Sequence, residues 1–187
     1  MSESLHALAE AALNDLGAVF KAMAEEALDE LIEEIVQAKR IVVFGLGREG
    51  LMMRAFAMRL FHMGRNVAVW GDMTTPEVGA GDLFIVSAGP GDLATARALA
   101  DVARAAGART ALVTAQPNGE LAKRVDVVTV IPAQTMADDR GAKLSVLPMG
   151  SLFEVAQMIA FELAILKLRP RFHETAETMR ARHTNLE

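Results

Sequence analysis

Apolar residues recur along this chain with two different spacings, and the change between them separates predicted helices from predicted strands. Residues 3–38 repeat an apolar side chain every three or four positions, which predicts one long N-terminal helix. Further on, short runs rich in Val, Ile and Thr are typical of buried strands. The five predicted strands cover residues 41–44, 67–70, 83–87, 110–114 and 127–131.

Helical patterns separate these strands within a sheet core that we place at about residues 40–131. The predicted helices cover about residues 50–63, 92–106 and 118–124, and Asp92 is a natural N-cap for the second of them. The alternation predicts a parallel sheet with right-handed crossovers and helices on both faces. This is a three-layer α/β/α fold of the flavodoxin or Rossmann type, in which ligands bind beyond the carboxyl ends of the strands.

The chain after the last predicted strand is organised differently. Residues 132–148 have the composition of an irregular loop, and residues 148–187 that of C-terminal helices and a tail. An apolar helix is predicted over residues 150–168, with Pro170 ending it and a polar helix over about 172–182 following. Because no repeat or linker interrupts the chain, we expect residues 1–187 to form a single domain.

Composition narrows the classes of protein to consider. Hydrophobic residues make up 52% of the chain, enough to cover both faces of the sheet and to form a subunit interface. We expect the long N-terminal helix to pack against another subunit, because it has little sheet to cover. The net charge of -5 argues against nucleic-acid binding. The absence of cysteine excludes disulfides and thiolate chemistry.

Other features of the sequence point to a cytoplasmic protein. The N-terminus lacks the basic and apolar regions of a signal peptide, and no stretch is long and apolar enough to span a membrane. No two histidines have metal-ligand spacing on one helix face, so we expect no metal site.

A glycine-spaced segment, Gly45-Leu46-Gly47-Arg48-Glu49-Gly50, follows the first predicted strand and opens a helix. Gly45 and Gly47 would let an anionic ligand approach the backbone N–H groups at the helix N-terminus. A dinucleotide, with Asp72 holding its ribose, and a sugar phosphate, beside the fixed charge of Arg48, are both compatible with this turn. The charge of Glu49 argues against a dinucleotide. A tight turn without a ligand is the structural alternative.

A second candidate segment, Ser87-Ala88-Gly89-Pro90-Gly91-Asp92, leaves the third predicted strand. Its position at a strand end, before a helix, is where a sugar or an anion would bind. A rigid turn shaped by Pro90 and the two glycines explains the same residues equally well.

Two residues in the C-terminal part are candidates for acid–base chemistry. Glu154 lies in the first turn of an apolar helix, where a carboxylate complements the helix dipole. Among apolar neighbours it can instead serve as a base near neutral pH. His183 lies in the polar tail, where an isolated histidine is usually solvated, and His62 has the position of a packing residue.

Three segments are distinctive when taken together. They are residues 45–60, residues 148–154 (Pro-Met-Gly-Ser-Leu-Phe-Glu) and the terminal residues 182–187 (Arg-His-Thr-Asn-Leu-Glu). Together they resemble the 6-phospho-3-hexuloisomerase branch of the sugar isomerase (SIS) domain family. The resemblance runs through nearly the whole chain, and the last two segments are its most specific parts.

The resemblance implies a five-stranded parallel sheet, a homotetramer, and a carbonyl shift between C3 and C2 of a hexulose 6-phosphate. It implies that Glu154 takes the C2 proton and returns it at C3 through an enediol. His183 would act as the matching acid–base group from the tail of a neighbouring subunit, and no cofactor is required. At the corresponding positions of this chain, we expect substrate to be bound by Gly45, Gly47, Arg48, Glu49, Ser87, Ala88, Gly89, Gly91, Asp92 and Ser151.

The chain also departs from the family pattern. The family has serine where this chain has Glu49, and a Ser-Gly-Ser-Gly-Glu-Thr run where this chain has residues 88–93. The lost hydroxyls, the missing N–H of Pro90 and the added charge all weaken phosphate binding. We therefore expect an isomerase of altered specificity. Its substrate would be a non-phosphorylated sugar bound by Glu49 and Asp92, or a sugar whose anion binds elsewhere. The cations available to that anion are Arg48, Arg140 and Lys143.

Two other functions stay open on sequence grounds. A non-catalytic sugar-sensing module would explain a degraded phosphate loop, and a nicotinamide-dependent oxidoreductase would explain the glycine-spaced turn.

Overall fold

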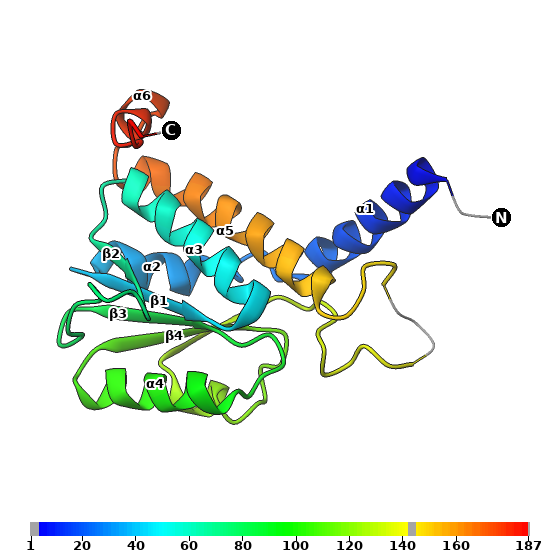
Figure 1. Ribbon diagram of the computed structural model, residues 1–187, viewed down its shortest axis with the longest axis horizontal. Coiled ribbons are helices and arrows are strands. Elements are labelled where there is room, and N and C mark those ends of the chain that lie inside the picture. The colour runs from blue at the N-terminus through cyan, green and yellow to red at the C-terminus, as the bar shows by residue number, and fades with distance from the viewer. Residues whose placement is uncertain (1–3, 142–144, 187) are drawn as a thin grey trace.

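The computed structural model describes residues 4–141 and 145–186. A five-stranded sheet forms its centre, with the order β2-β1-β3-β4-β5 and parallel pairing throughout (Figure 1). The strands are β1 (Ile41–Gly45), β2 (Val67–Val69), β3 (Leu83–Ser87), β4 (Arg109–Thr114) and β5 (Val127–Val130). The predicted five-stranded parallel sheet is confirmed.

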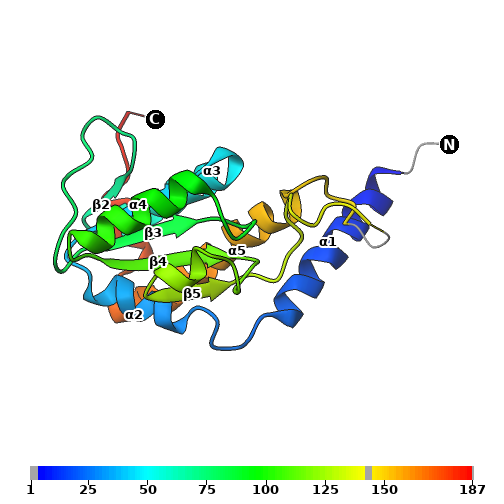
Figure 2. The same ribbon diagram turned by 90° about the horizontal axis from the view of Figure 1, so that it is seen from below.

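Helices cover both faces of this sheet, which confirms the three-layer fold (Figures 1 and 2). One layer contains α2 (Asp29–Gln37), α3 (Gly47–His62) and α5 (Ser151–Arg171), and the other contains α4 (Ala94–Ala105) and the short 3-10 helix η1 (Ala122–Arg124). Successive strand residues point to opposite layers, so Val43 belongs to the first core and Val42 to the second. Both faces are buried, which is why the strands are almost continuously apolar.

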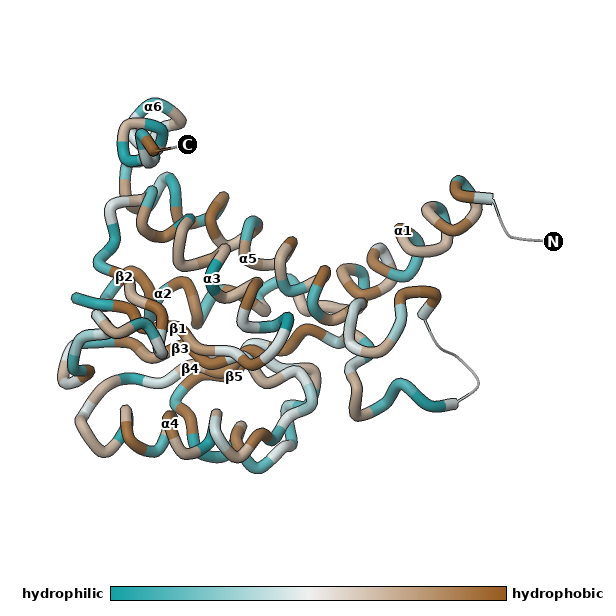
Figure 3. Tube along the Cα trace, viewed as in Figure 1, coloured by the Kyte–Doolittle hydropathy of each residue, from teal (hydrophilic) through white to brown (hydrophobic). Residues whose placement is uncertain are grey.

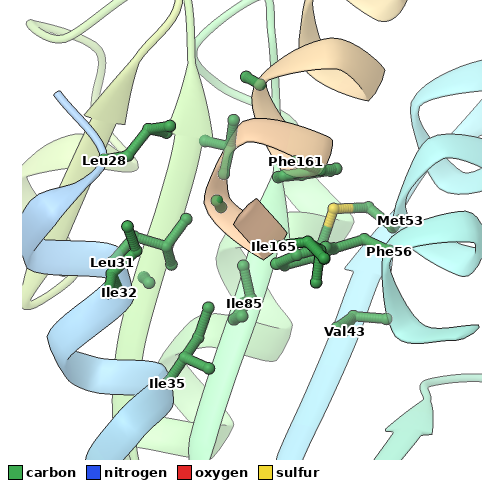
Figure 4. Close-up of a cluster of buried hydrophobic side chains, with 14 of the residues drawn as sticks. Leu28, Leu31, Ile32, Ile35, Val43, Met53, Phe56, Ile85, Phe161 and Ile165 are labelled. Atoms are coloured by element: carbon green, nitrogen blue, oxygen red, sulfur yellow. The ribbon is translucent and has the colours of Figure 1, made fainter. Parts of the chain in front are cut away.

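The larger core lies between the sheet and α2, α3 and α5. Figure 4 shows side chains of these three helices gathered over Val43 and Ile85 of the central strands. Phe56 of α3 and Phe161 of α5 stack with their ring centroids 4.2 Å apart. Figure 3 shows the same concentration of hydrophobic residues along the strands. This packing fixes α3 beside α5, and so positions the first turns of both helices.

The predicted N-terminal helix over residues 3–38 is wrong as a single element. The structure has α1 (Leu5–Ala22) and α2, because Met23 adopts an extended conformation that ends α1. α2 then packs on the sheet, whereas α1 extends away from it (Figures 1 and 2). Leu5 and Leu13 of α1 are 78% and 68% exposed. Packing of α1 against another subunit stays a prediction.

The C-terminal elements differ from the prediction in their ends. Asp92 is not an N-cap, because α4 begins only at Ala94 and Asp92 instead pairs with Arg97 at 3.1 Å. The pattern over residues 118–124 forms only the short η1. Pro170 does not end α5, which continues to Arg171 because a proline in the last turn removes a single helical hydrogen bond. The polar helix α6 is shorter than predicted, Ala176–Arg180.

Candidate active site

The first turns of α3 and α5 meet at the carboxyl edge of the sheet and line a cleft of about 240 Å³. Residues from the loop after β3 and from the loop before α5 complete it, and the candidate residues that line it are Gly47, Arg48, Glu49 and Glu154. A parallel sheet places the ends of β1 and β3 side by side at this edge, the usual ligand position in such folds. A larger cavity, about 560 Å³, lies beside β2 and is lined by Asp72, the residue considered for a dinucleotide ribose, but by none of the candidate catalytic or sugar-binding residues.

Glu154 is held in this cleft by an arginine from the facing helix. Its carboxylate oxygen Oε2 lies 3.0 Å from Nε of Arg48, and Nη1 of Arg48 donates a hydrogen bond to Oγ of Ser151 at 2.7 Å. The Glu154 side chain is 15% exposed. Within the part of the chain that the structure describes, Oε2 is buried and accepts no hydrogen bond, so the contact with Arg48 is ionic. The Glu154 carboxylate lines the cleft and can accept a proton there, with the opposite charge of Arg48 beside it.

Glu49 points the other way, into the loop after β3. Its Oε2 accepts hydrogen bonds from Oγ of Ser87 and from the N–H of Gly89, the latter at 2.9 Å. Burial raises the pKa of Glu49, the hydrogen bonds from Ser87 and Gly89 oppose that rise, and the nearby charge of Glu154 adds to it. The charge of Glu154, the candidate base, therefore acts directly on the pKa of Glu49.

The raised pKa of Glu49 predicts a pH-dependent stability. Folding favours the protonated carboxyl, so this contribution is complete below the ordinary pKa of 4.5 and is lost as the pH rises through the raised value. Glu49→Gln cannot ionise, so its free energy of unfolding relative to wild type is expected to rise from about pH 4.5 towards neutrality. Urea unfolding at a series of pH values measures this difference.

Glu120→Gln provides the control for that pH series. Glu120 is exposed, and its hydrogen bond with Lys123 lowers its pKa, so the variant is not expected to gain relative stability over the same pH range. A Glu49→Gln difference that stays flat with pH would contradict the assignment.

Gln157 is a residue of this site that the sequence analysis missed. It is fully buried on α5, and its Nε2 donates to Oγ of Ser87 at 2.8 Å. The hydroxyl of Ser87 therefore accepts from Gln157 and donates to Glu49. The available signal was a single amide side chain three residues after Glu154, inside an otherwise apolar stretch of helix.

In the turn between β1 and α3, Gly45 and Gly50 are needed for close backbone packing and not for contact with a ligand. A Cβ on Gly50 would lie 2.5 Å from the carbonyl oxygen of Gly45, so these two residues let the end of β1 touch the first turn of α3. Gly47 has a φ of 55°, which places it in the left-handed region, and it lines the cleft. Gly45 was predicted to admit a ligand, yet it does not line the cleft.

The loop after β3 divides between the cleft and the interior. Pro90 lines the cleft, and Gly89 lies against Phe153, whose ring would be 2.8 Å from an added Cβ. Ala88 is buried in the second core, and Gly91 packs against Gln116. Asp92 forms an ion pair with Arg97 and does not line the cleft. Arg140 does not line the cleft either, and Lys143 lies outside the described residues.

His183 lies at the opposite end of α5 from Glu154. It follows α6, which lies beyond the C-terminal end of α5 (Figure 1). Its ring centroid is 5.2 Å from that of His62, which is buried as expected of a packing residue. His183 shares a pocket with Glu162 and Leu166 of α5, and Glu162 is already about 12 Å of helix rise beyond Glu154. One chain therefore does not bring the predicted catalytic pair together, and a shared site between subunits stays a prediction.

Comparison with known proteins identifies the family. Residues 34–167 match the SIS domain. The chain belongs to the SIS domain family. It is 41% identical over 157 residues to the 3-hexulose-6-phosphate isomerase of Mycobacterium gastri, covering 84% of this chain and 78% of the relative. It is 34% identical over 175 residues to the enzyme of that name from Bacillus subtilis (strain 168), covering 94% of this chain and 95% of the relative.

A solved structure agrees with this SIS assignment. The crystal structure of a hypothetical protein from Methanococcus jannaschii, with an inferred function of 3-hexulose-6-phosphate isomerase, superposes with a TM-score of 0.81 at 28% identity. The match covers 95% of this SIS chain and 98% of the other.

Two kinds of feature are absent from the part of the chain that the structure describes. Within residues 4–141 and 145–186, no three His, Asp or Glu side chains are grouped so that they could hold a metal ion. In the same residues, no helix has the length and apolar character needed to cross a membrane.

Proposed function

We propose that this protein is an isomerase that moves a carbonyl between C3 and C2 of a sugar, as its relatives' name, 3-hexulose-6-phosphate isomerase, implies for them. Two observations support the proposal: the relatives are named as isomerases, and Glu154 is placed where a base for such a reaction is needed. The carboxylate lines a cleft at the ligand-binding edge of the sheet, where its Oε2 accepts no hydrogen bond from the described residues.

The geometry supports a mechanism with one base. The carboxylate of Glu154 removes the proton from C2 of a 3-ketose, the C2–H electrons form a C2–C3 double bond, and the C3 carbonyl becomes an enediolate oxygen. Proton movement between the two oxygens and return of the proton to C3 leave the carbonyl at C2. The guanidinium of Arg48, 3.0 Å from the base, is placed to stabilise the oxyanion as it develops.

Deuterium exchange tests the reaction. Ketohexoses and pentuloses, with and without a terminal phosphate, are incubated with the protein in deuterated water and followed by NMR. Wash-in at the carbon beside the carbonyl is expected for at least one substrate class. Binding without wash-in would favour the sugar-sensing alternative, and enhancement of nicotinamide fluorescence would favour the oxidoreductase.

The second part of the proposal is that each site is completed by a neighbouring subunit of a homotetramer. Support comes from the exposed apolar face of α1 and from the distance between Glu154 and His183 within one chain. The tail of another subunit would then bring His183 to Glu154, where an imidazole can move protons between the sugar oxygens.

Mixing two inactive variants measures this sharing. Glu154→Gln and His183→Asn are each expected to be inactive, and hybrids formed by unfolding and refolding them together are expected to regain about a quarter of the wild-type activity. Each mixture is compared with the two variants refolded separately. No recovery in hybrids of confirmed mixed composition would contradict a site built from two chains.

A further inference from the structure

The loop after β3 contains a small anion-binding position. The hydroxyl of Ser87 and the N–H of Gly89 converge on a single point at the carboxyl edge of the sheet. Convergent hydroxyl and backbone donors at such an edge bind a negatively charged oxygen. In this chain Oε2 of Glu49 occupies that point.

Core packing holds this arrangement in place. Ser87 and Gln157 are fully buried, and the hydrogen bond from Gln157 to Ser87 directs the hydroxyl proton of Ser87 towards Glu49. Gly89 has no room to move away, because Phe153 and Oε1 of Glu49 both lie within 3.0 Å of where its Cβ would be. The Glu49 carboxylate is therefore part of the folded interior as well as of the cleft wall.

The charge balance of the cleft opposes a phosphate in the same place. Two carboxyl groups, Glu49 and Glu154, face one guanidinium, and Arg48 is already engaged by Glu154 and Ser151. A phosphate oxygen at the loop would have to displace Glu49 from both donors and would meet further negative charge. A sugar hydroxyl meets no such conflict, because an ionised carboxylate has about four acceptor positions and two are used here.

We infer that Glu49 is an internal anion that selects against phosphate, so that the end of the substrate that reaches this loop is uncharged and carries hydroxyl groups. This rests on the proposed isomerase function for its substrate, but the occupied anion position itself does not depend on activity. The test therefore has a binding arm and a reaction arm.

The binding arm uses inorganic phosphate and isothermal titration calorimetry. Wild type is expected to bind phosphate at least about 10-fold more weakly than Glu49→Gln and Glu49→Ser, which remove the charge and vacate the position respectively. Asp101→Asn changes the net charge equally, on the exposed face of α4 where Asp101 pairs with Arg124, and is expected to behave as wild type. Equal phosphate binding by wild type and both Glu49 variants, each folded by thermal melting, would overturn the inference.

The reaction arm compares deuterium wash-in into fructose and fructose 6-phosphate. Wild type is expected to favour fructose, and Glu49→Ser to shift the ratio of the two rates at least about 100-fold towards the phosphate ester. A wild-type preference for fructose 6-phosphate that neither variant changes would overturn the inference. Gain of phosphate binding in the variants without exchange in any protein would uphold the internal anion and refute the isomerase.

Discussion

Glu154→Gln is expected to reduce deuterium wash-in and kcat/KM by about 1,000-fold. The substitution keeps the shape of the side chain, but an amide oxygen is far too weak a base to take a proton from carbon. Arg48 and Ser151 stay in place, since the hydrogen bond between them does not involve Glu154. The wash-in rate, measured by NMR under saturating substrate, isolates the proton-transfer step from substrate binding.

The control for this loss is the same chemical change on the surface. Glu120→Gln removes a carboxylate that is 59% exposed and pairs only locally with Lys123, so its wash-in rate is expected to stay within about twofold of wild type. Retention of more than about a tenth of the wild-type rate by Glu154→Gln would show that another group is the base.

Gly50→Ala is expected to lower the free energy of unfolding by about 3 kcal/mol, although alanine normally favours a helix by about 1 kcal/mol over glycine. The added Cβ would lie 2.5 Å from the carbonyl oxygen of Gly45 and 3.1 Å from its carbonyl carbon. Both are backbone atoms at the end of a central strand, so relief requires α3 to move away from β1. Urea unfolding monitored by circular dichroism measures the loss.

Gly17→Ala makes the same exchange where space is available. Gly17 lies within α1 and a Cβ there would meet no atom within 4 Å, so a gain of up to about 1 kcal/mol is expected. If both variants gave the same small change, the close contact between Gly45 and Gly50 would not be a constraint on the fold.

The sheet could be predicted from sequence because its strands are buried on both faces. Five separate apolar runs, such as those ending at Gly45 and Ser87, leave little choice of element, and intervening helices force parallel pairing. The break between α1 and α2 could not be predicted. Residues 23–28 contain neither glycine nor proline, so the helical period continues through a turn that tertiary packing creates.

The candidate site was predictable to the extent that its residues belong to recognisable segments. Arg48, Ser151 and Glu154 meet although 103 residues separate the first two, and the family resemblance had grouped them. Periodicity alone could not assign Glu49 to the β3 loop, because a residue in the first turn of a helix can face several directions. Gln157 was missed because one amide in an apolar helix resembles an ordinary interruption.

The first two turns of α5 carry Ser151, Glu154 and Gln157 at intervals of three, so one side of the helix contacts both Arg48 and Ser87. Each residue added to or removed from a helix rotates everything beyond it by about 100°. Substitutions at neighbouring positions leave these contacts aligned. A single insertion between residues 151 and 157 would turn Ser151 and Gln157 to different sides of the helix, so that the contacts with Arg48 and Ser87 could not form together. A residue added to the irregular segment before this helix would instead leave the same face of α5 towards Arg48 and Ser87.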